Sequence, residues 1–586
     1  MAVNRSNADE KRSTVSKKTT ILRVLKYIAE YRLQVTCVIL MMLVASVITV
    51  VLPLLTENAI DVQIAGGNRQ GLITVSIIAA ALALLWSALI IIRVRIMAKI
   101  SNAVVLRVRS EAFAHLQTLG LHYFDSRPTG KILSRLIGDV TSLKDLLRQM
   151  VTNLIPNLFF LIVVSVVMAV KNILFFGATV VVMPIMVAGT FIIFRKAFDY
   201  WQGFRQKQSN VNAFAHEVTS GIRVVQSFNA QEEVKKSFRT ITEEVQQQWT
   251  GAVSRSDFIG IVIDVSQGLG YFLLYFLAVR THATVGSLVA FTTFIGLFWR
   301  PLRQLASMAN NLGNQLSGAE RVFEIMDTKS TLLESENPVP LKAVSGRVDF
   351  EDVSFAYPDE PETSVLEHVS FSVEPGKTIA LVGPTGAGKT TIINLLARFY
   401  DPVGGRILID GTDIKDVKIE DLRRHIGVMT QDSFLFSGTI RDNLVYGKLD
   451  ATQEEIERAC KALGAHDFIM ATEKGYDTEI NDQTLSQGQR QLLSLSRTLL
   501  ADPSILILDE ATSAIDTYTE MLVQKGIRLL TEGRTSFVVA HRLSTIKNAD
   551  RILVIDRKGI QEQGNHQELL EKGGQYSALY RAQFEW

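Results

Sequence analysis

The chain has 586 residues, more than the roughly 250–300 over which a single hydrophobic core usually extends, so we expect several domains. A formal net charge of +2 excludes an overall electrostatic attraction to nucleic acid, and two cysteines, Cys37 and Cys460, exclude a disulfide framework. Hydrophobic residues make up 47% of the chain, which is high for a soluble enzyme and points to membrane segments.

The first twenty residues are polar and basic and lack the apolar core of a cleavable signal, so we expect a disordered cytoplasmic tail. Six apolar stretches follow, and most reach the roughly 20 residues that a helix needs to cross a bilayer. Buried helices of a soluble core are the alternative, but uncharged runs of this length are rare there. The sixth stretch is short, and we count it because an even number returns the chain to its starting side. The stretches cover residues 33–56, 71–92, 151–170, 173–194, 258–279 and 285–299.

The connections between these stretches differ in length and charge. Residues 93–150 carry ten lysines and arginines and residues 195–257 carry nine, whereas each of the other connections carries one. By the positive-inside rule, the two long connections and both chain termini are cytoplasmic. Apolar residues recur at helical spacing in both, so we predict that membrane helices extend into the cytoplasm and turn near residues 124–131 and 227–232.

Four polar side chains fall within the predicted spans: Asn153, Asn157, Asp264 and Gln267. Polar groups at membrane depth are costly and usually face a bundle interior or a water-filled cavity. We therefore predict that these residues line a substrate cavity. A purely structural role between helices is the alternative, above all for the amides.

A polar helical stretch over residues 303–327 leads into a segment rich in Ser, Pro and charge, where we predict the domain boundary. The expected organisation is a tail (residues 1–20), a transmembrane domain (21–327), a linker (328–345) and a second domain (346–586). Strand and helix patterns alternate in the second domain after two early antiparallel strands, as in α/β proteins. The expected fold is therefore a six-helix all-α transmembrane domain followed by an α/β P-loop domain.

The sequence GPTGAGKTT, residues 383–391, follows the apolar strand pattern TIALV and precedes an aliphatic helix pattern. It matches the P-loop pattern G-x-x-x-x-G-K-[ST]. In such a turn backbone N–H groups converge on phosphate oxygens, the lysine adds positive charge and the hydroxyl binds Mg²⁺. A glycine-rich turn without a ligand is the alternative, which the flanking strand and helix disfavour. The predicted phosphate-binding residues are Gly383, Pro384, Thr385, Gly386, Ala387, Gly388, Lys389, Thr390 and Thr391.

Two further segments point to nucleotide chemistry. ILILDEAT, residues 505–512, predicts a buried strand that ends in Asp509, placed to hold Mg²⁺, and Glu510, free to deprotonate an attacking water. In residues 484–500, small residues and Gly488 precede a helix, which predicts a second phosphate cradle. One nucleotide does not need two cradles, so we expect the second to serve an ATP held by a different subunit. Tyr357, at a predicted strand end, is placed to stack on adenine, although packing is the commoner role.

Together these residues resemble the ATP-binding cassette (ABC) half-transporters of the exporter type, including multidrug-resistance proteins, and the likeness runs from residue 20 onward. It implies two halves in a head-to-tail sandwich, with ATP and Mg²⁺ between the Walker motifs of one subunit and the signature of the other. The motifs are the P-loop (Walker A), Gln431 in VMTQDSFLF (Q-loop), LSQGQ at 485–489 (signature), LILDE (Walker B), SAID at 513–516 (D-loop), His541 in VVAHRLST (switch) and Tyr357 (A-loop).

The resemblance also implies roles for single residues in the nucleotide-binding domain, 346–586. Thr390, Gln431 and Asp509 would hold Mg²⁺, and Ser486, Gly488 and Gln489 would contact the ATP of the other subunit. His541 would bond the γ-phosphate. The catalytic set would be Glu510, His541, Lys389 and Gln431.

Two features depart from the commonest family pattern. Gln487 stands where the signature usually has Gly, and the segment before it lacks the usual Glu-Arg-Gly. In heterodimeric members, the chain that keeps the catalytic Glu often donates an imperfect signature. The resemblance therefore favours a heterodimer over a homodimer.

The function that the resemblance implies is ATP-driven multidrug efflux: export of hydrophobic or amphipathic compounds across the cytoplasmic membrane by alternating access. The implied partners are a second ABC half-transporter, the lipid bilayer and a small hydrophobic substrate, with no nucleic acid. The alternatives are a lipid flippase and an ATP-gated channel or regulator, and an importer is a smaller possibility.

Overall fold

The computed structural model describes residues 17–341, 344–430, 433–481, 484–509, 516–539 and 546–584. The described residues form two compact units. The helical unit contains residues 17–114 and 133–326, and the mixed unit contains residues 115–132 and the described residues from Asp327 onward.

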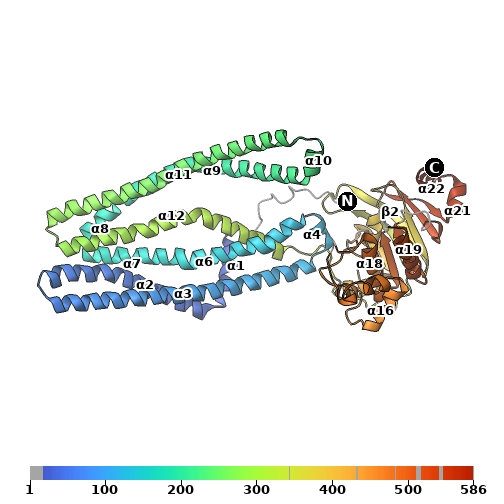
Figure 1. The fold of residues 1–586 in the computed structure, drawn as a ribbon, viewed down its shortest axis with the longest axis horizontal. Coiled ribbons are helices and arrows are strands. Elements are labelled where there is room, and N and C mark those ends of the chain that lie inside the picture. The colour runs from blue at the N-terminus through green and yellow to red at the C-terminus, as the bar shows by residue number, and fades with distance from the viewer. Residues whose placement is uncertain are drawn as a thin grey trace. The chain divides into compact units, whose positions relative to one another are not determined.

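The helical unit is built mainly from long helices (Figure 1). Its described residues also include three short π-helical turns. Of these helices, α3 alone has 50 residues, which corresponds to about 75 Å, more than twice the thickness of a bilayer's hydrocarbon core. This length agrees with the predicted extension of membrane helices beyond the lipid, which stays a prediction. The elements are α1 (Lys17–Ala29), α2 (Arg32–Asn58), η1 (Ala59–Ile64), α3 (Arg69–Thr118), η2 (Ser134–Asp139), α6 (Val140–Gln149), η3 (Met150–Leu154), α7 (Ile155–Lys171), α8 (Ile173–Val180), α9 (Met183–Ser220), α10 (Ile222–Ser227), α11 (Gln231–Thr281) and α12 (Val285–Asp327). The short helix α5 (Thr129–Leu133) lies almost entirely in the mixed unit.

Six helical segments are long and apolar enough to cross a membrane, as predicted. The sixth reaches Leu305 and is therefore longer than the sequence pattern indicates. Large apolar side chains lie on the outside of these segments, for example Leu84 at 74% and Val279 at 79% exposure. Exposed apolar surface of this extent is unfavourable in water, so lipid is the medium that fits it.

Two of the prolines that the sequence places in the spans lie near helix irregularities. Pro156 stands at the start of α7, directly after the π-helical turn η3, and Pro184 stands at the start of α9. Proline has no N–H to donate to the preceding turn, so helices begin or are distorted there.

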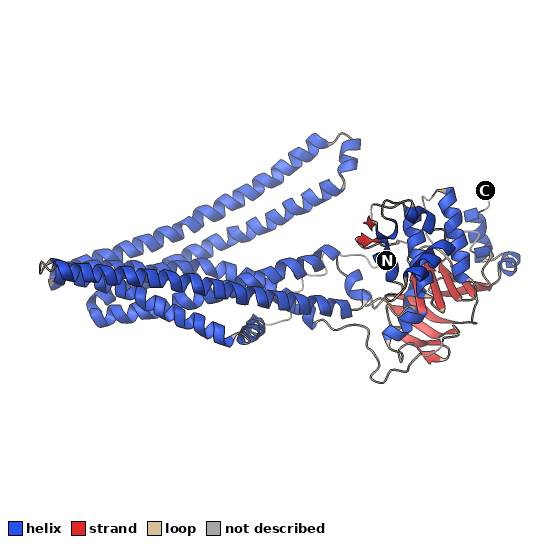
Figure 2. Cartoon of the chain, turned by 60° about the horizontal axis from the view of Figure 1, so that its bottom comes forward, coloured by secondary structure: helices blue, strands red, loops and turns tan. Residues whose placement is uncertain are grey.

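The described residues of the mixed unit form three sheets. Figure 2 shows the strands in red with helices in blue around them. A four-stranded sheet has the order β2 (Ser364–Val373), β1 (Val348–Ala356), β4 (Gly404–Ile409), β5 (Thr412–Asp413), and β1 pairs with β2 in the antiparallel sense that the sequence predicts. A six-stranded sheet has the order β12 (Gly559–Gly564), β11 (Arg551–Asp556), β3 (Thr378–Val382), β10 (Thr535–Val539), β9 (Ile505–Asp509), β6 (Ile426–Met429). The short strands β7 (Gly438–Thr439) and β8 (Glu479–Ile480) form the third sheet.

The helices of the mixed unit pack on three apolar cores. The first core lies under α13 and the four-stranded sheet, the second lies under α15, α16, α18 and α19, and the third lies under α21 and α22. The helices are α4 (Leu121–Asp125), α13 (Lys389–Leu396), α14 (Ile419–His425), α15 (Ile440–Val445), α16 (Gln453–Ala462), α17 (His466–Met470), η4 (Gly475–Asp477), α18 (Gln487–Ala501), α19 (Thr517–Thr531), α21 (His566–Lys572) and α22 (Gln575–Phe584).

In the six-stranded sheet, β10 lies between β3 and β9 and runs parallel to both. The register pairs Val539 with Leu381 on one side and with Asp509 on the other. The carboxyl ends of β3, β9 and β10 therefore lie along one edge, where open α/β sheets bind ligands.

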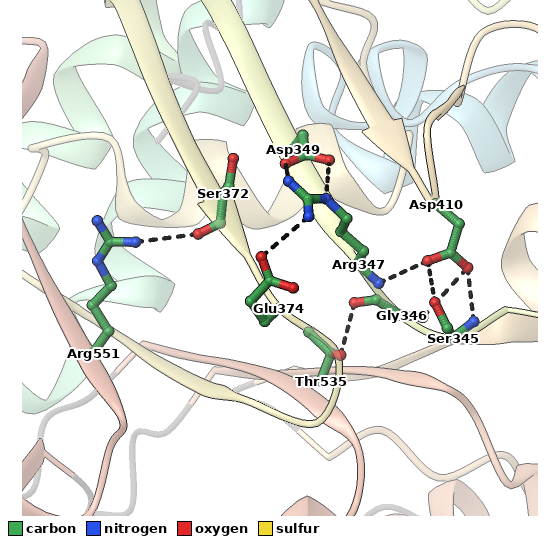
Figure 3. Close-up of polar contacts among 9 residues, drawn as sticks. All are labelled: Ser345, Gly346, Arg347, Asp349, Ser372, Glu374, Asp410, Thr535 and Arg551. Atoms are coloured by element: carbon green, nitrogen blue, oxygen red, sulfur yellow. Dashed lines mark hydrogen bonds and ion pairs between the residues drawn. The ribbon is translucent and has the colours of Figure 1, made fainter.

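Polar contacts fix the start of β1 against neighbouring strands (Figure 3). The Asp410 carboxylate accepts hydrogen bonds from the backbone N–H groups of Ser345 and Arg347 at 2.7 and 2.9 Å. Thr535, at the start of β10, donates from its hydroxyl to the Gly346 carbonyl at 2.7 Å. The segment just before β1 is thereby tied to both sheets.

Arg398, which follows α13, is a fully buried cation with 0% exposure. Its guanidinium donates to the carbonyl oxygens of Ile414 and Val417, both at 2.8 Å, and of Leu333 at 2.9 Å. Because Leu333 belongs to the segment after α12, one side chain holds that segment and the loop after β5 together.

Replacing Arg398 by Met should lower the melting temperature of the mixed unit by about 5–10 °C, because buried carbonyl oxygens lose their donor at a cost of about 2–4 kcal/mol. The measurement is thermal unfolding of the purified chain. The control is Arg424→Met, since that guanidinium is 67% exposed and pairs with Glu420 at the surface, and its change should stay within about 2 °C. Equal shifts in the two variants would contradict the structural role of Arg398.

Candidate functional site

The loop between β3 and α13 has a backbone conformation that depends on its glycines. Gly386 has φ 85° and Gly388 has φ 103°, both in the left-handed region. A Cβ on Gly383 would lie 2.1 Å from the Ile555 carbonyl oxygen, so only glycine fits against β11 at this point. Such a turn before a helix points successive N–H groups into one concavity, which is the geometry of a phosphate cradle.

Lys389, the first residue of α13, is buried to 7% exposure. Its ammonium donates to the carbonyl oxygens of Gly383 and Pro384 at 2.7 and 2.8 Å. Burial lowers the pKa of Lys389, and the negative charge of Asp509 partly opposes this shift. The ammonium group is therefore held over the loop. A bound anion there would offset the free-energy cost of burying its positive charge.

The remaining loop residues divide into an exposed and a buried set. Pro384, Thr385, Gly386 and Thr390 are exposed, and Ala387 is partly buried. Thr391 is buried to 4% exposure, and its hydroxyl oxygen lies 3.1 Å from the Tyr357 hydroxyl oxygen. Thr390 is thus open to a ligand, while Thr391 fastens Tyr357 to α13.

Tyr357 belongs to an aromatic cluster next to the loop. Its ring meets the rings of Phe355 and Tyr400 edge to face, at centroid distances of 5.0 and 5.3 Å. Tyr357 is partly buried. This contact fixes the ring that the sequence assigns to adenine stacking.

Asp509 ends β9, two strands from β3 across the sheet. Its carboxylate is near enough to act on the pKa of Lys389. Glu510, Gln431 and His541 lie outside the described residues. The strands that precede them, β9, β6 and β10, are neighbours in one parallel arrangement.

The signature residues form the start of α18. Ser486 accepts from the Gln489 N–H at 3.3 Å, and the Gln489 side chain accepts from the Ser486 N–H at 3.0 Å. This is a capping box, which the Ser-x-x-Gln spacing could have predicted. Gly488 is buried, and Leu485 packs on the second core rather than on the core that carries the P-loop helix.

In the helical unit, Asp264 and Gln267 are brought together by a residue that the sequence analysis missed. Arg303 donates to Asp264 Oδ1 at 2.9 Å and to Gln267 Oε1 at 2.6 Å. Gln267 in turn donates to the Tyr271 hydroxyl at 2.9 Å. The sequence does place this arginine within one helical turn of Pro301. A basic residue next to a proline is typical of the end of a membrane span, so the sequence pattern did not indicate a contact with Asp264.

The two asparagines lie elsewhere along the chain, on η3 and α7. Asn153 is exposed, and the Asn157 Nδ2 atom is buried without a hydrogen-bond partner among the described residues. The structure therefore joins two of the four predicted cavity residues and does not join the asparagines to them.

Gly383→Ala should weaken ATP binding by roughly 10-fold or more, because the added methyl group collides with the Ile555 carbonyl and strains the loop. The measurement is titration of the purified chain with a fluorescent ATP analogue. Gly559→Ala is the matched control, since a Cβ there meets its nearest atom at 3.7 Å, and it should leave the affinity unchanged. Wild-type affinity in Gly383→Ala would contradict the cradle.

Comparisons with known proteins agree with this architecture. Residues 35–302 match the family model of the ABC transporter transmembrane region, and residues 366–513 match the ABC transporter family model. A probable multidrug resistance ABC transporter ATP-binding/permease protein of Bacillus subtilis (strain 168), YheH, is 36% identical over 82% of this chain and 72% of its own length. The ATP-dependent lipid A-core flippase of Syntrophus aciditrophicus (strain SB) is 32% identical over 96% of this chain and 94% of its own length.

A solved structure is similar over nearly the whole chain. A bacterial Atm1-family ABC exporter with ATP bound superposes with a TM-score of 0.79 at 30% identity, covering 95% of this chain and 99% of that chain. The chain therefore belongs to the ABC exporter half-transporters, multi-pass membrane proteins in which a helical transmembrane region and an ATP-hydrolysing domain share one polypeptide.

Proposed function

We propose that this chain uses ATP binding and hydrolysis to export hydrophobic or amphipathic compounds across the cytoplasmic membrane. The observation that carries the proposal is the presence, in one polypeptide, of a glycine-shaped P-loop and six helices that can span a bilayer. The similarity to a multidrug resistance transporter and to a bacterial exporter with ATP bound supports the same function.

The proposed ATP site is assembled at the carboxyl edge of the six-stranded sheet. The loop N–H groups and Lys389 bind the phosphates, and Tyr357 stacks on adenine. Oxygen donors suit Mg²⁺, so Thr390 and Asp509, together with Gln431, are the proposed magnesium ligands. When bound, Mg²⁺ neutralises charge on the phosphates.

Hydrolysis is assigned to residues at the ends of the parallel strands. Glu510 follows the last residue of β9 and is the proposed general base for the attacking water, and His541 is the proposed partner of the γ-phosphate. Positioning and charge neutralisation by Lys389 supply the larger part of the catalysis.

Glu510→Gln should leave ATP affinity unchanged and slow hydrolysis by roughly 10²–10⁴-fold, because the amide cannot accept the proton of the attacking water. Nucleotide titration and steady-state phosphate release by the same preparation separate the two properties. Near-wild-type phosphate release would refute the assignment.

The signature contributes to a second subunit's site in this proposal. The capping box orders the start of α18, a 15-residue helix whose N-terminal dipole favours a phosphate. Ser486, Gly488 and Gln489 then contact the partner's ATP. A heterodimer is favoured over a homodimer because Gln487 departs from the commonest signature while Glu510 is kept.

The proposed substrate cavity includes the polar cluster of Asp264, Gln267 and Arg303. The Arg303 and Asp264 side chains are 44% and 66% exposed, so the ion pair is open rather than sealed between helices. Charged groups at membrane depth are retained where they face a water-filled cavity. Asn153 and Asn157 remain proposed cavity residues on the third span. Such a cavity suits compounds with an apolar body and a polar group.

Inside-out membrane vesicles that contain the wild-type chain should accumulate the dye Hoechst 33342 when MgATP is added, and Lys389→Ala vesicles should not. Movement of fluorescent lipid between leaflets without dye uptake would instead favour a flippase, which the likeness to a lipid A-core flippase keeps as the second candidate. ATP-dependent currents without uphill uptake would indicate a channel.

We also propose that both termini are cytoplasmic and that the transmembrane domain, residues 21–327, meets the nucleotide-binding domain, 346–586, through the linker 328–345. The ten and nine basic residues in the two long connections support this orientation.

A further inference from the structure

Four polar side chains lie along one face of α11, within the fifth segment that can span a membrane. A helix brings residues three and four positions apart onto the same face, so these four form a stripe about 16 Å long. The next face of the helix is apolar, since Phe272 and Phe276 are 63% and 50% exposed. The stripe consists, in chain order, of Asp264, Gln267, Tyr271 and Tyr275.

The first end of this stripe is an ion pair with unused hydrogen-bonding groups. Arg303 of α12 donates to Asp264 Oδ1 at 2.9 Å and to Gln267 Oε1 at 2.6 Å. Among the described residues, Asp264 Oδ2 accepts no hydrogen bond, and a guanidinium offers five N–H groups. The Asp264 and Arg303 side chains are 66% and 44% exposed, so a negative and a positive group are open side by side.

The other end of the stripe carries hydroxyl groups and aromatic rings. The Tyr271 and Tyr275 rings stack with centroids 6.4 Å apart, and the Tyr275 hydroxyl lies 3.4 Å from Thr292 Oγ1 of α12. A Cβ on Gly296 would lie 3.6 Å from the Tyr271 hydroxyl, so α12 passes close to the stripe there. Tyr275 nevertheless remains 43% exposed. The stripe therefore continues from charged groups to accessible ring surface.

A purely structural ion pair does not account for this arrangement. Exposed ion pairs contribute little to stability, and charged groups at membrane depth are costly unless they meet water or another polar group. Because Asp264 and Arg303 are oppositely charged, a ligand with one charge is attracted by one of them and repelled by the other. A ligand that carries both charges places an opposite charge next to each.

We propose that the stripe binds amphiphiles whose head group is zwitterionic. The cationic part of the head group lies at Asp264, the anionic part lies at Arg303, and the apolar chain follows the rings of Tyr271 and Tyr275. The proposal rests on the export function proposed above and names the chemical class of its substrate. In the proposed orientation the Asp264 end of the stripe is nearer the cytoplasm, so a molecule from the cytoplasmic leaflet meets the ion pair with its head group.

Three amphiphiles that share a dodecyl chain test the head group. Dodecylphosphocholine is zwitterionic, dodecyltrimethylammonium is cationic and dodecyl phosphate is anionic. The measurement is the concentration of each, below its critical micelle concentration, that gives a half-maximal change in ATP hydrolysis by the paired half-transporter. Nanodiscs of uncharged digalactosyldiacylglycerol avoid electrostatic enrichment of either ion. The wild type should respond to dodecylphosphocholine at roughly 5–10-fold lower concentration than to the other two, because only a zwitterion meets both charges.

Two single substitutions should shift this preference in opposite directions. Arg303→Gln leaves the Asp264 carboxylate unpaired, so dodecyltrimethylammonium should become the most potent of the three. Asp264→Asn leaves the guanidinium unpaired, so dodecyl phosphate should become the most potent. Arg303→Lys keeps a cation and should keep the wild-type order. A structural role would instead weaken all three responses alike.

The control is a second ion pair in the helical unit, which joins α2 to α7. Lys171 Nζ lies 3.0 Å from Glu57 Oε2, and Glu57→Gln and Lys171→Gln should both keep the wild-type order of the three amphiphiles. The proposal is overturned if the wild type responds to all three at equal concentrations. It is also overturned if Arg303→Gln and Asp264→Asn change the three responses in parallel.

Nanodiscs of phosphatidylcholine identify the source of the zwitterion. If the bilayer's own phospholipid occupies the stripe, it competes and raises the half-maximal concentration of dodecylphosphocholine. An unchanged concentration assigns the stripe to free amphiphiles. Either result supports the site.

The response of ATP hydrolysis and the uptake of dye test different claims. Absence of Hoechst 33342 uptake, with the head-group preference intact, would contradict the proposed export and leave the binding site standing. Dye uptake without any head-group preference would overturn the zwitterion site and leave export standing.

Discussion

The arrangement of the mixed unit depends on the close approach of the loop after β3 to the neighbouring strand β11. At Gly383 the backbone passes so near the Ile555 carbonyl that no side chain fits, and Gly386 and Gly388 then turn the chain through left-handed conformations. These constraints bring the loop N–H groups and Lys389 to one place. Because β9 and β10 run parallel to β3 in the same sheet, the acidic end of β9 lies at the same edge.

The helical unit is constrained instead by the lipid that surrounds its apolar surface. Many of its large apolar side chains point outward, which lipid tolerates and water does not, and among its apolar spans Arg303 and Asp264 form an ion pair. An exposed ion pair between Arg303 and Asp264 is expensive at membrane depth, which is why we propose that it faces a water-filled substrate cavity. Long helices such as α3 pass from this environment to the mixed unit as single elements.

Local patterns made much of this architecture predictable. Apolar runs of membrane length identified the spans, and the fixed spacing of Gly383, Gly388 and Lys389 identified the loop, because these signals lie within a few residues of one another. The bond between Tyr400 and Asp125 joins residues 275 positions apart, and Arg303 meets Asp264 across 39 positions. Such contacts are created by tertiary docking and leave no local pattern. The roles of Glu510, Gln431 and His541 still rest on sequence and family likeness.

The central claim is that each chain binds ATP in a site that is complete only when a second chain contributes its signature. The most direct measurement is the rate of ATP hydrolysis per chain in nanodiscs sorted by copy number. The account predicts that discs with a single chain hydrolyse ATP roughly 10²-fold more slowly than discs with the paired half-transporter, because the opposing signature is missing from the site. Equal rates per chain in the two kinds of disc would contradict it.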